Sequence, residues 1–224
     1  MKKIVILGTG GNCIDILDTL LDINRAQGRT MYECLGFLDD DPTKWGFVFQ
    51  GIKVLGPLSK STEFDDCFFV FGIGSTSNFW KRDDILAKTG IENQRLETII
   101  HPTAYISQSA TIGQGCIIFQ NTVIASNAVI GTCVYLLPNS IISHNSTIGD
   151  FTCITGSVCV SGSVRIGKKC YIGANSAIKD GVSIGDCSLI GMGSIVLKDV
   201  FGNCVVAGNP ARLLRNIKFG ATER

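Results

Sequence analysis

The chain has 224 residues, a length that suits one large domain or two modest ones. It is 45% apolar and 17% charged, so it can bury a core and is not a disordered linker. The 20 Lys and Arg residues against 19 Asp and Glu give a net charge of +1, which leaves no basic field for phosphates. Nucleic acid is therefore not an expected partner.

The apolar run near the N-terminus is far too short for a signal peptide, and no later run approaches the ~20 residues needed to span a bilayer. We expect a cytoplasmic protein without membrane insertion. The ten cysteines include no C-x-x-C pair, which favours buried thiols over a disulfide framework or a Cys-based metal site.

Strands and helices alternate in the first 100 residues. Continuous apolar runs predict strands at 4–7, 35–38 and 68–73. Between the first two, apolar residues recur at helical spacing until Gly28, which predicts a helix with Cys13, Ile16, Leu17, Leu20 and Leu21 on its buried side. This alternation is typical of a parallel sheet.

A six-residue repeat begins after His101-Pro102 and continues for sixteen hexads. An aliphatic residue occupies the same place in each hexad: Ile106, Ile112, Ile118, Ile124, Ile130, Leu136, Ile142, Ile148, Ile154, Val160, Ile166, Ile172, Ile178, Ile184, Ile190 and Val196. A small residue follows four positions later every time, from Ala110 to Val200, so each hexad has one large and one small inward position. Cys116 and Cys170 occupy the small position.

The repeat has a longer period of 18 residues. Glycine recurs at 113, 131, 149, 167 and 185, and small residues recur in register at 107, 125, 143 and 161. Three hexads per turn with a bend after each describe a three-sided parallel β-helix of about five coils, roughly 25 Å long at the spacing of stacked strands. Periodicity leaves its handedness open.

The N-terminal half carries a possible nucleotide site at the ends of its strands. Gly8-Thr9-Gly10-Gly11 falls at a strand-to-helix turn, the place where phosphates are often bound. Asp39 and Asp40 follow the next strand, where carboxylates can bind ribose hydroxyls or a base N–H. Gly72-Ile73-Gly74 ends the third strand, with Asn78 just beyond, and the three strand ends converge on one edge.

These motifs together resemble one family. The hexad array resembles the left-handed β-helix acyltransferases, and residues 5–11, 36–42 and 100–102 resemble the bacterial sugar-nucleotide acetyltransferases that N-acetylate 4-amino sugars such as bacillosamine and perosamine precursors. The resemblance covers nearly the whole chain. It implies a Rossmann-like α/β domain at 1–100 that binds a nucleotide sugar, a left-handed β-helix acetyltransferase domain at 101–215, a tail at 216–224, and a homotrimer.

His144 is the candidate catalytic base. Acyl transfer from a thioester to an amine needs a base that titrates near neutral pH, and histidine meets this need without unusual tuning. Gly162 lies one coil further on, where a backbone N–H can stabilise the oxyanion. The resemblance assigns both roles. The family's acidic residue after the base is Asn145 here, whose amide we expect to accept a hydrogen bond from the ring, and its second histidine is Cys153, expected to pack rather than react.

The resemblance also supplies the ligands. It implies that a UDP- or dTDP-linked amino sugar is bound by Gly10, Gly11, Asp39, Asp40, Gly74 and Asn78. Acetyl-CoA is the implied co-substrate, lying along the C-terminal coils near Gly162, Gly173 and Gly191, with Arg212 or Lys198 as partners for its phosphates.

Several alternatives remain at this stage. The γ-class carbonic anhydrases of this fold need three histidines for zinc and the chain has two, so no metal is expected. A sugar O-acetyltransferase of the same fold is the nearest alternative, although an alcohol relies more on a charged base system than Asn145 offers. A non-catalytic sugar-nucleotide-binding homologue is the second. An NAD enzyme is disfavoured because Cys13 replaces the third glycine of the dinucleotide fingerprint.

Overall fold

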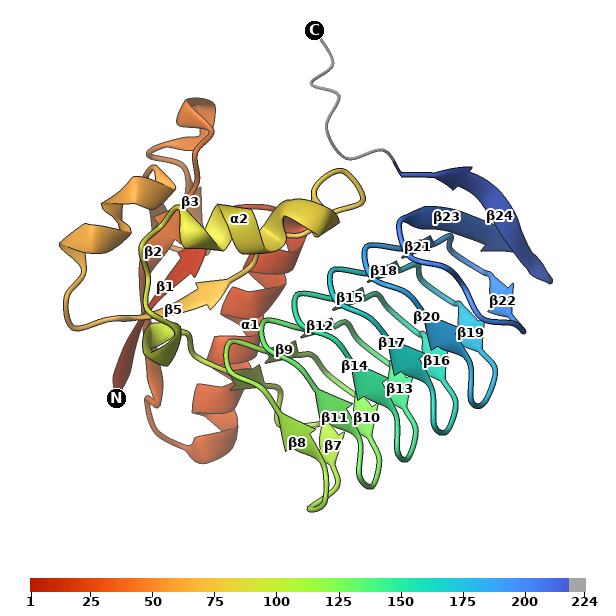
Figure 1. Ribbon diagram of the computed structural model, residues 1–224. Helices are drawn as coiled ribbons and strands as arrows, with labels where there is room; N and C mark the ends of the chain where they lie inside the picture. The colour runs from red at the N-terminus through yellow and green to blue at the C-terminus, as the bar shows by residue number, and fades with distance from the viewer. Residues whose placement is uncertain (218–224) are drawn as a thin grey trace, which may run out of the picture.

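The computed structural model describes residues 1–217, which form an N-terminal α/β unit and a prism of stacked strands (Figure 1). The last seven residues of the predicted tail, 218–224, lie outside the described residues. No helix within 1–217 is long and apolar enough to cross a bilayer.

The N-terminal unit is a five-stranded sheet in the order β3-β4-β2-β1-β5, parallel except for the β3–β4 pair. Its elements are β1 (Lys2–Leu7), α1 (Gly11–Gln27), β2 (Tyr32–Leu38), β3 (Val48–Phe49), β4 (Ile52–Gly56), β5 (Phe68–Phe71) and α2 (Arg82–Ala87), with 3-10 turns at Pro42–Lys44, Leu58–Glu63, Phe79–Lys81 and Asn93–Arg95.

The sequence predicted these strands and the first helix. Helix α1 ends at Gly28, which has φ 62°, the left-handed conformation that glycine adopts readily. Two details differ from prediction. Leu21 is 43% exposed because it falls beyond the stripe that packs on the sheet. Strand β5 stops at Phe71, since Gly72-Ile73-Gly74 leaves the sheet as a loop.

The prism has three sheets, one per side, which are parallel except for the β23–β24 pair, and all sixteen predicted aliphatic residues end a two-residue strand and point inward. The strands are β6 (Ile99–Ile100), β7 (Tyr105–Ile106), β8 (Thr111–Ile112), β9 (Ile117–Ile118), β10 (Val123–Ile124), β11 (Val129–Ile130), β12 (Tyr135–Leu136), β13 (Ile141–Ile142), β14 (Thr147–Ile148), β15 (Cys153–Ile154), β16 (Cys159–Val160), β17 (Arg165–Ile166), β18 (Tyr171–Ile172), β19 (Ala177–Ile178), β20 (Ser183–Ile184), β21 (Leu189–Ile190), β22 (Ile195–Val196), β23 (Cys204–Gly208) and β24 (Ala211–Asn216). Strand β6 starts the prism two residues before the predicted start of that domain at 101.

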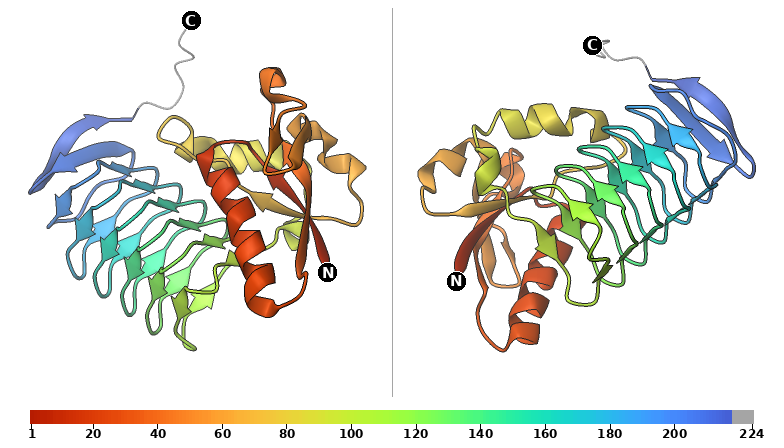
Figure 2. Two further views of the ribbon diagram at one scale, coloured as in Figure 1. Left: turned by 180° about the vertical axis from the view of Figure 1, so that it is seen from behind. Right: turned by 60° about the horizontal axis from the view of Figure 1, so that its bottom comes forward.

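We call one side of the prism the domain face, because its outward residues contact the N-terminal unit. It is formed by β6, β9, β12, β15, β18, β21, β23 and β24. Tyr135 and Cys153 project from this face into one apolar cluster with Ile4, Ile16 and Leu20. Figure 2 shows α1 lying against this end of the prism in both views.

Glycines stack along the corner that precedes the domain face, which we call the glycine corner. A Cβ on Gly149 would lie 2.5 Å from the backbone carbon of Gly167, so only glycine permits this spacing of coils. The opposite corner joins the sheet of β13 to the sheet of β14 and is called the far corner. Its bends span residues 107–110, 125–128, 143–146, 161–164 and 179–182.

All ten cysteines are free. The buried-thiol prediction is confirmed for Cys116 and Cys170, which are fully buried in the small positions, and for most of the others. It is wrong for Cys159, which is exposed because it occupies the outward position of β16.

Candidate functional site

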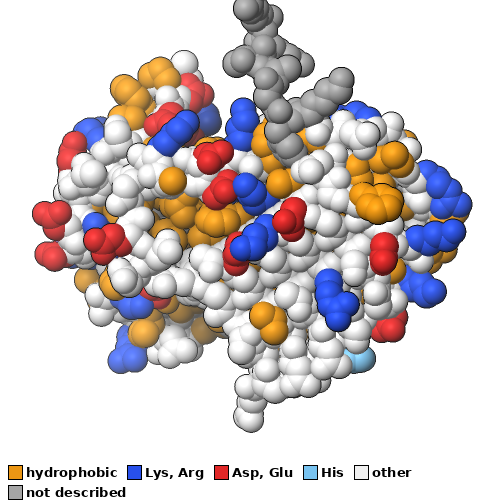
Figure 3. Space-filling model, viewed as in Figure 1, with side chains coloured by type: hydrophobic (Ala, Val, Ile, Leu, Met, Phe, Trp, Pro, Cys, Tyr) orange, Lys and Arg blue, Asp and Glu red, His pale blue; other side chains and the backbone are white. Residues whose placement is uncertain are grey.

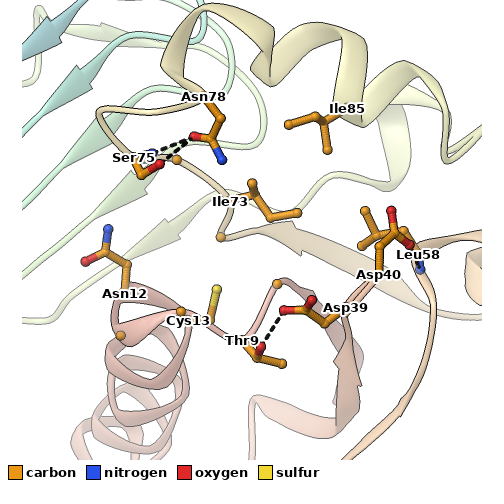
Figure 4. A pocket seen from close by; sticks show the side chains of 15 residues that line it. Thr9, Asn12, Cys13, Asp39, Asp40, Leu58, Ile73, Ser75, Asn78 and Ile85 are labelled. Atoms are coloured by element: carbon orange, nitrogen blue, oxygen red, sulfur yellow. Dashed lines mark hydrogen bonds between the residues drawn. The ribbon is translucent and has the colours of Figure 1, made fainter. Parts of the chain in front are cut away.

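A cavity of about 520 Å³ opens at the carboxyl ends of β1, β2 and β5 (Figure 4). All six residues predicted to bind the nucleotide sugar line it: Gly10, Gly11, Asp39, Asp40, Gly74 and Asn78. The convergence follows from the parallel sheet, in which successive strands end at the same edge. The cavity also has apolar walls that sequence reasoning missed, Leu58 and Ile85, because they come from elements with no recognisable motif.

The first turn of α1 forms one wall of this cavity. A Cβ on Gly10 or Gly11 would meet nothing within 4 Å, so the backbone there is open to a ligand. The first N–H groups of a helix have no intrahelical acceptor and carry partial positive charge, which suits a diphosphate. Gly8, by contrast, has φ 103° and no room for a Cβ beside Ile73 and Cys13. Burial raises the pKa of the Cys13 thiol to about 12, so it stays protonated.

Asp39 and Asp40 differ in how many carboxylate oxygens are free to bind a ligand. Asp39 is held inside the protein: it accepts hydrogen bonds from the hydroxyl of Thr9 and the N–H of Asp41, and Lys44 lies 3.3 Å from it. Asp40 accepts only the N–H of Leu58, at 2.9 Å, with one carboxylate oxygen. Its second oxygen has no partner among residues 1–217, so Asp40 is the better candidate for a ligand contact.

Asn78 closes the cavity on the side of α2. Its Oδ1 accepts the backbone N–H of Ser75 at 2.7 Å and the Ser75 hydroxyl at 3.0 Å, as Figure 4 shows. Gly74 lies in the same loop, and a Cβ there would be 3.1 Å from Nε of Arg82. The loop after β5 is therefore fixed by its own hydrogen bonds and by Arg82.

His144 lies exposed at the far corner, directly against the next coil. An ideal Cβ on Gly162 would lie 2.6 Å from Cε1 and 2.8 Å from Nε2 of the His144 ring. The N–H of Gly162 donates to no acceptor within residues 1–217. The structure thus brings the predicted base and the predicted oxyanion donor together, and glycine is needed for that proximity.

Two neighbours complete the far corner. Nδ2 of Asn145 lies 3.0 Å from Nδ1 of His144, so the amide donates to the ring. The sequence predicts that this amide accepts from the ring; in the structure Nδ2 of Asn145 faces the ring, and its Oδ1 accepts from Asn127 at 3.1 Å. On the other side, Oδ1 of Asp180 lies 2.8 Å from the same Cβ position on Gly162. Sequence reasoning missed Asp180, although its position 18 residues after Gly162 is the available signal.

The residues predicted to bind acetyl-CoA do not form one cluster. Gly173 and Gly191 are packed against the following coil: a Cβ on Gly173 would lie 2.5 Å from the N of Met192, and one on Gly191 would lie 2.6 Å from Cβ of Ala207. Coil stacking alone therefore explains both glycines. Arg212 and Lys198 instead share a groove of about 510 Å³ at the end of the prism.

Arg82 joins the N-terminal unit to the prism and is fully buried. Its guanidinium donates to the carbonyls of Ile73, Cys133 and Phe151 at 2.7–3.0 Å and lies 4.0 Å from the ring centre of Tyr135. Lys169 and Asp83 form an ion pair beside it at 2.8 Å.

These contacts fix where the two candidate sites lie relative to each other. Every one of them falls on the domain face or the glycine corner, whereas His144 projects from the far corner. Among residues 1–217, those that line the cavity do not include His144.

Cys153 is almost completely buried under Gly74 and Arg82. Burial raises the pKa of its thiol, with the nearby Arg82 acting in the opposite direction. A buried protonated thiol fits the packing role expected from the sequence. Within residues 1–217, no group of three His, Cys, Asp or Glu side chains is placed to hold a metal ion.

The fold defines a hexapeptide-repeat protein with a Rossmann-like N-terminal unit. Residues 3–87 match the PglD N-terminal domain, and residues 100–197 match the GMPPB C-terminal domain. The chain is 30% identical over 124 residues to UDP-N-acetylbacillosamine N-acetyltransferase of Bacillus subtilis, a match that covers 53% of this chain and 51% of that protein.

Two solved structures are similar over nearly the whole chain. The acetyltransferase domain of PglB from Neisseria gonorrhoeae, in complex with acetyl coenzyme A, has 26% identity and a TM-score of 0.80, covering 95% of this chain and 99% of that one. PerB from Caulobacter crescentus, in complex with CoA and GDP-perosamine, has 22% identity and a TM-score of 0.80, covering 95% and 97%.

These matches confirm the family resemblance. The chain is similar to the hexapeptide-repeat sugar-nucleotide N-acetyltransferases, with a Rossmann-like domain followed by a left-handed β-helix.

Proposed function

We propose that the protein is an acetyl-CoA-dependent N-acetyltransferase acting on the 4-amino group of a UDP- or dTDP-linked 4-amino-4,6-dideoxy sugar. In this proposal residues 1–100 bind the nucleotide sugar and residues 101–215 carry the chemistry. The observation that carries it is the placement of the His144 ring against Gly162, whose N–H is free. The 30% identical relative and the acetyl-CoA complex of the 26% identical domain support the substrate class and the donor.

The chemistry is direct transfer. The sugar amine attacks the thioester carbonyl, and His144 takes the proton that the nitrogen loses as the C–N bond forms. The N–H of Gly162 stabilises the negative oxygen of the tetrahedral intermediate. Collapse breaks the C–S bond and releases CoA as the thiolate, which is protonated by the imidazolium or by water. No covalent acyl-protein is needed, which agrees with the buried state of Cys153.

We propose that the cavity and the His144 of one working site come from different chains. The N-terminal unit contacts the domain face and the glycine corner, and the far corner points away from it. A neighbouring copy that brings its cavity to this far corner completes the site. Three-sided prisms related by a three-fold axis place such a pair at each of three interfaces, so we propose a homotrimer with shared sites. Since both co-substrates are cytoplasmic metabolites, we propose a cytoplasmic enzyme.

The activity is tested by measuring thiol release from acetyl-CoA against a panel of UDP- and dTDP-linked 4-amino sugars and their hydroxyl analogues. We expect turnover with an amino sugar and a loss of about 10² or more in His144→Ala. Turnover on hydroxyl sugars alone would instead identify an O-acetyltransferase. Binding of both ligands without turnover would identify a non-catalytic homologue.

The shared site is tested by complementation. Gly10→Glu puts a negative charge at the start of α1, in open space and at a backbone φ of −68° that any residue adopts, so it should block diphosphate binding without harming the fold. His144→Ala and Gly10→Glu should each be inactive alone, and mixed oligomers of the two should regain activity because some interfaces then carry two intact halves. Absence of any recovery in confirmed mixed oligomers would contradict a site shared between chains.

A further inference from the structure

A row of polar side chains runs along the far corner and ends at the His144 ring. Residues 109, 127 and 145 occupy the same position in successive coils. The hydroxyl of Ser109 accepts the backbone N–H of Asn127 at 3.0 Å, and Nδ2 of Asn127 donates to Oδ1 of Asn145 at 3.1 Å. Nδ2 of Asn145 then donates to Nδ1 of His144 at 3.0 Å. Both asparagines have φ near 57°, a left-handed conformation that Asn tolerates well.

This row of amides has a direction, and the direction decides which nitrogen of the ring carries a proton. An amide NH₂ group only donates, so Nδ1 of His144 must act as the acceptor. The neutral ring then carries its hydrogen on Nε2, the nitrogen that faces Gly162.

A protonated Nε2 cannot take a proton from the substrate amine. For Nε2 to act as a base, Asn145 must turn its Oδ1 to the ring and accept from Nδ1–H. Its NH₂ group then faces Asn127, which must present Oδ1 instead of Nδ2. Asn145 therefore cannot reverse alone without losing its hydrogen bond to Asn127, a net loss that costs about tenfold in population, so the orientations of the two amides are coupled.

We propose that Asn127 is a positioning residue that sets the tautomer of His144 through the amide of Asn145, one coil away from the ring. The inference rests on the proposed function of His144 as the base. Asn127 itself touches neither the ring nor, by its place in the row, the reacting atoms. It acts by choosing which end of the Asn145 amide faces His144.

The test exploits a carboxylate, which accepts hydrogen bonds and does not donate them. In Asn127→Asp the new carboxylate must accept Nδ2 of Asn145, so Oδ1 of Asn145 turns to the ring and Nδ1 is protonated. Asn145→Asp should produce the same tautomer directly. Asn121→Asp is the matched control. Asn121 also has φ 57° and donates to an asparagine one coil further on, Asn139, but Asn139 has no histidine beside it as Asn145 does.

The readout is ¹⁵N NMR of the ring nitrogens above the titration range, at about pH 8.5. The chain has two histidines, and the His144→Ala spectrum assigns them. We expect an Nε2–H ring for His144 in the wild type and in Asn121→Asp, and an Nδ1–H ring in Asn127→Asp and Asn145→Asp. Acetyl transfer should rise about tenfold in Asn127→Asp with an unchanged KM.

An Nε2–H ring that persists in Asn127→Asp would overturn the proposal, as would a wild-type ring that already carries its proton on Nδ1. A tautomer that switches as expected in a protein without any acetyl transfer supports the role of Asn127 and counts against the proposed function instead. The NMR readout therefore separates the two.

Discussion

Replacing Gly162 by alanine tests the geometry of the far corner most directly. The added methyl would lie 2.6 Å from Cε1 and 2.8 Å from Nε2 of His144, with Oδ1 of Asp180 at 2.8 Å on its other side. Ordinary carbon contacts are about 3.5 Å or more, so the ring must move by about 1 Å. Because His144 is exposed, it can move without disturbing the core.

The expected result is a selective loss of activity. A displacement of about 1 Å at a reacting group costs on the order of 10² in rate, so kcat/KM should fall by about that factor. The free energy of unfolding should change by less than about 1 kcal/mol, since Gly162 does not have the left-handed φ that disfavours alanine, and the smaller entropy of the unfolded chain offsets the displaced ring.

The assay is thiol release from acetyl-CoA, with thermal unfolding measured in parallel. Gly156→Ala is the control, because its nearest contact would be the carbonyl oxygen of Pro138 at an ordinary 3.6 Å. Full activity in Gly162→Ala would refute the placement of the ring against this glycine. Equal losses in both variants would show that any added methyl on the coils disturbs the enzyme.

Three further predictions concern stability and thiol chemistry. Arg82→Met should lower the free energy of unfolding by about 3 kcal/mol in denaturant titration, because it removes the buried donor of three backbone carbonyls; a loss below about 1 kcal/mol would contradict this role. A hydrogen bond from the N–H of Thr132, and to a smaller extent the charge of Lys168, hold the pKa of Asp150 below its ordinary value. The stability that Asp150 contributes is therefore fully present above its pKa in the unfolded chain and is lost as the pH falls through its pKa in the folded protein. Asp150→Asn should therefore cost about 0.5 kcal/mol in the free energy of unfolding at neutral pH and nothing near pH 2; an equal cost at the two pH values would contradict this. Cys159 should be the first thiol to react with a disulfide reagent, and Cys159→Ser should abolish the fastest phase; equally fast labelling in that variant would contradict its assignment.

The distribution of charged side chains on the surface does not point to the functional site. Figure 3 shows side chains of both signs on the visible face, with several Lys and Arg side chains along the edge formed by the C-terminal coils, and the net charge is +1. The functional information instead lies in local geometry at the cavity and the far corner. Two residues of the same type can therefore differ in role, as Asp39 and Asp40 do, because one is held by Thr9 and Lys44 while the other is not.

Sequence periodicity was sufficient for the prism. Each hexad encodes a short strand, an inward aliphatic residue and a bend, and these are local properties, so Ile106 to Val196 could be placed without knowing their neighbours. The convergence of Gly10, Asp39 and Gly74 on one cavity was also predictable, since parallel strands end at the same edge. The adjacency of His144 and Gly162 followed from the 18-residue period.

Contacts between distant segments could not be predicted. Nothing near Arg82 in the sequence indicates that it bridges to the carbonyls of Cys133 and Phe151, which occupy bends 51 and 69 residues away. Such contacts determine how the N-terminal unit packs on the domain face. They therefore also determine where its cavity lies relative to His144.

The direction of the amide row from Asn127 to His144 is likewise a tertiary property. A sequence specifies which groups can donate and accept, whereas the stacking of coils decides which of them meet. The sequence alone thus determined the repeat, the cavity and the pairing of His144 with Gly162, because each depends on local bends at a regular spacing. Only the tertiary structure decided the rest, because hydrogen bonds between coils and domains depend on where separate segments come to lie.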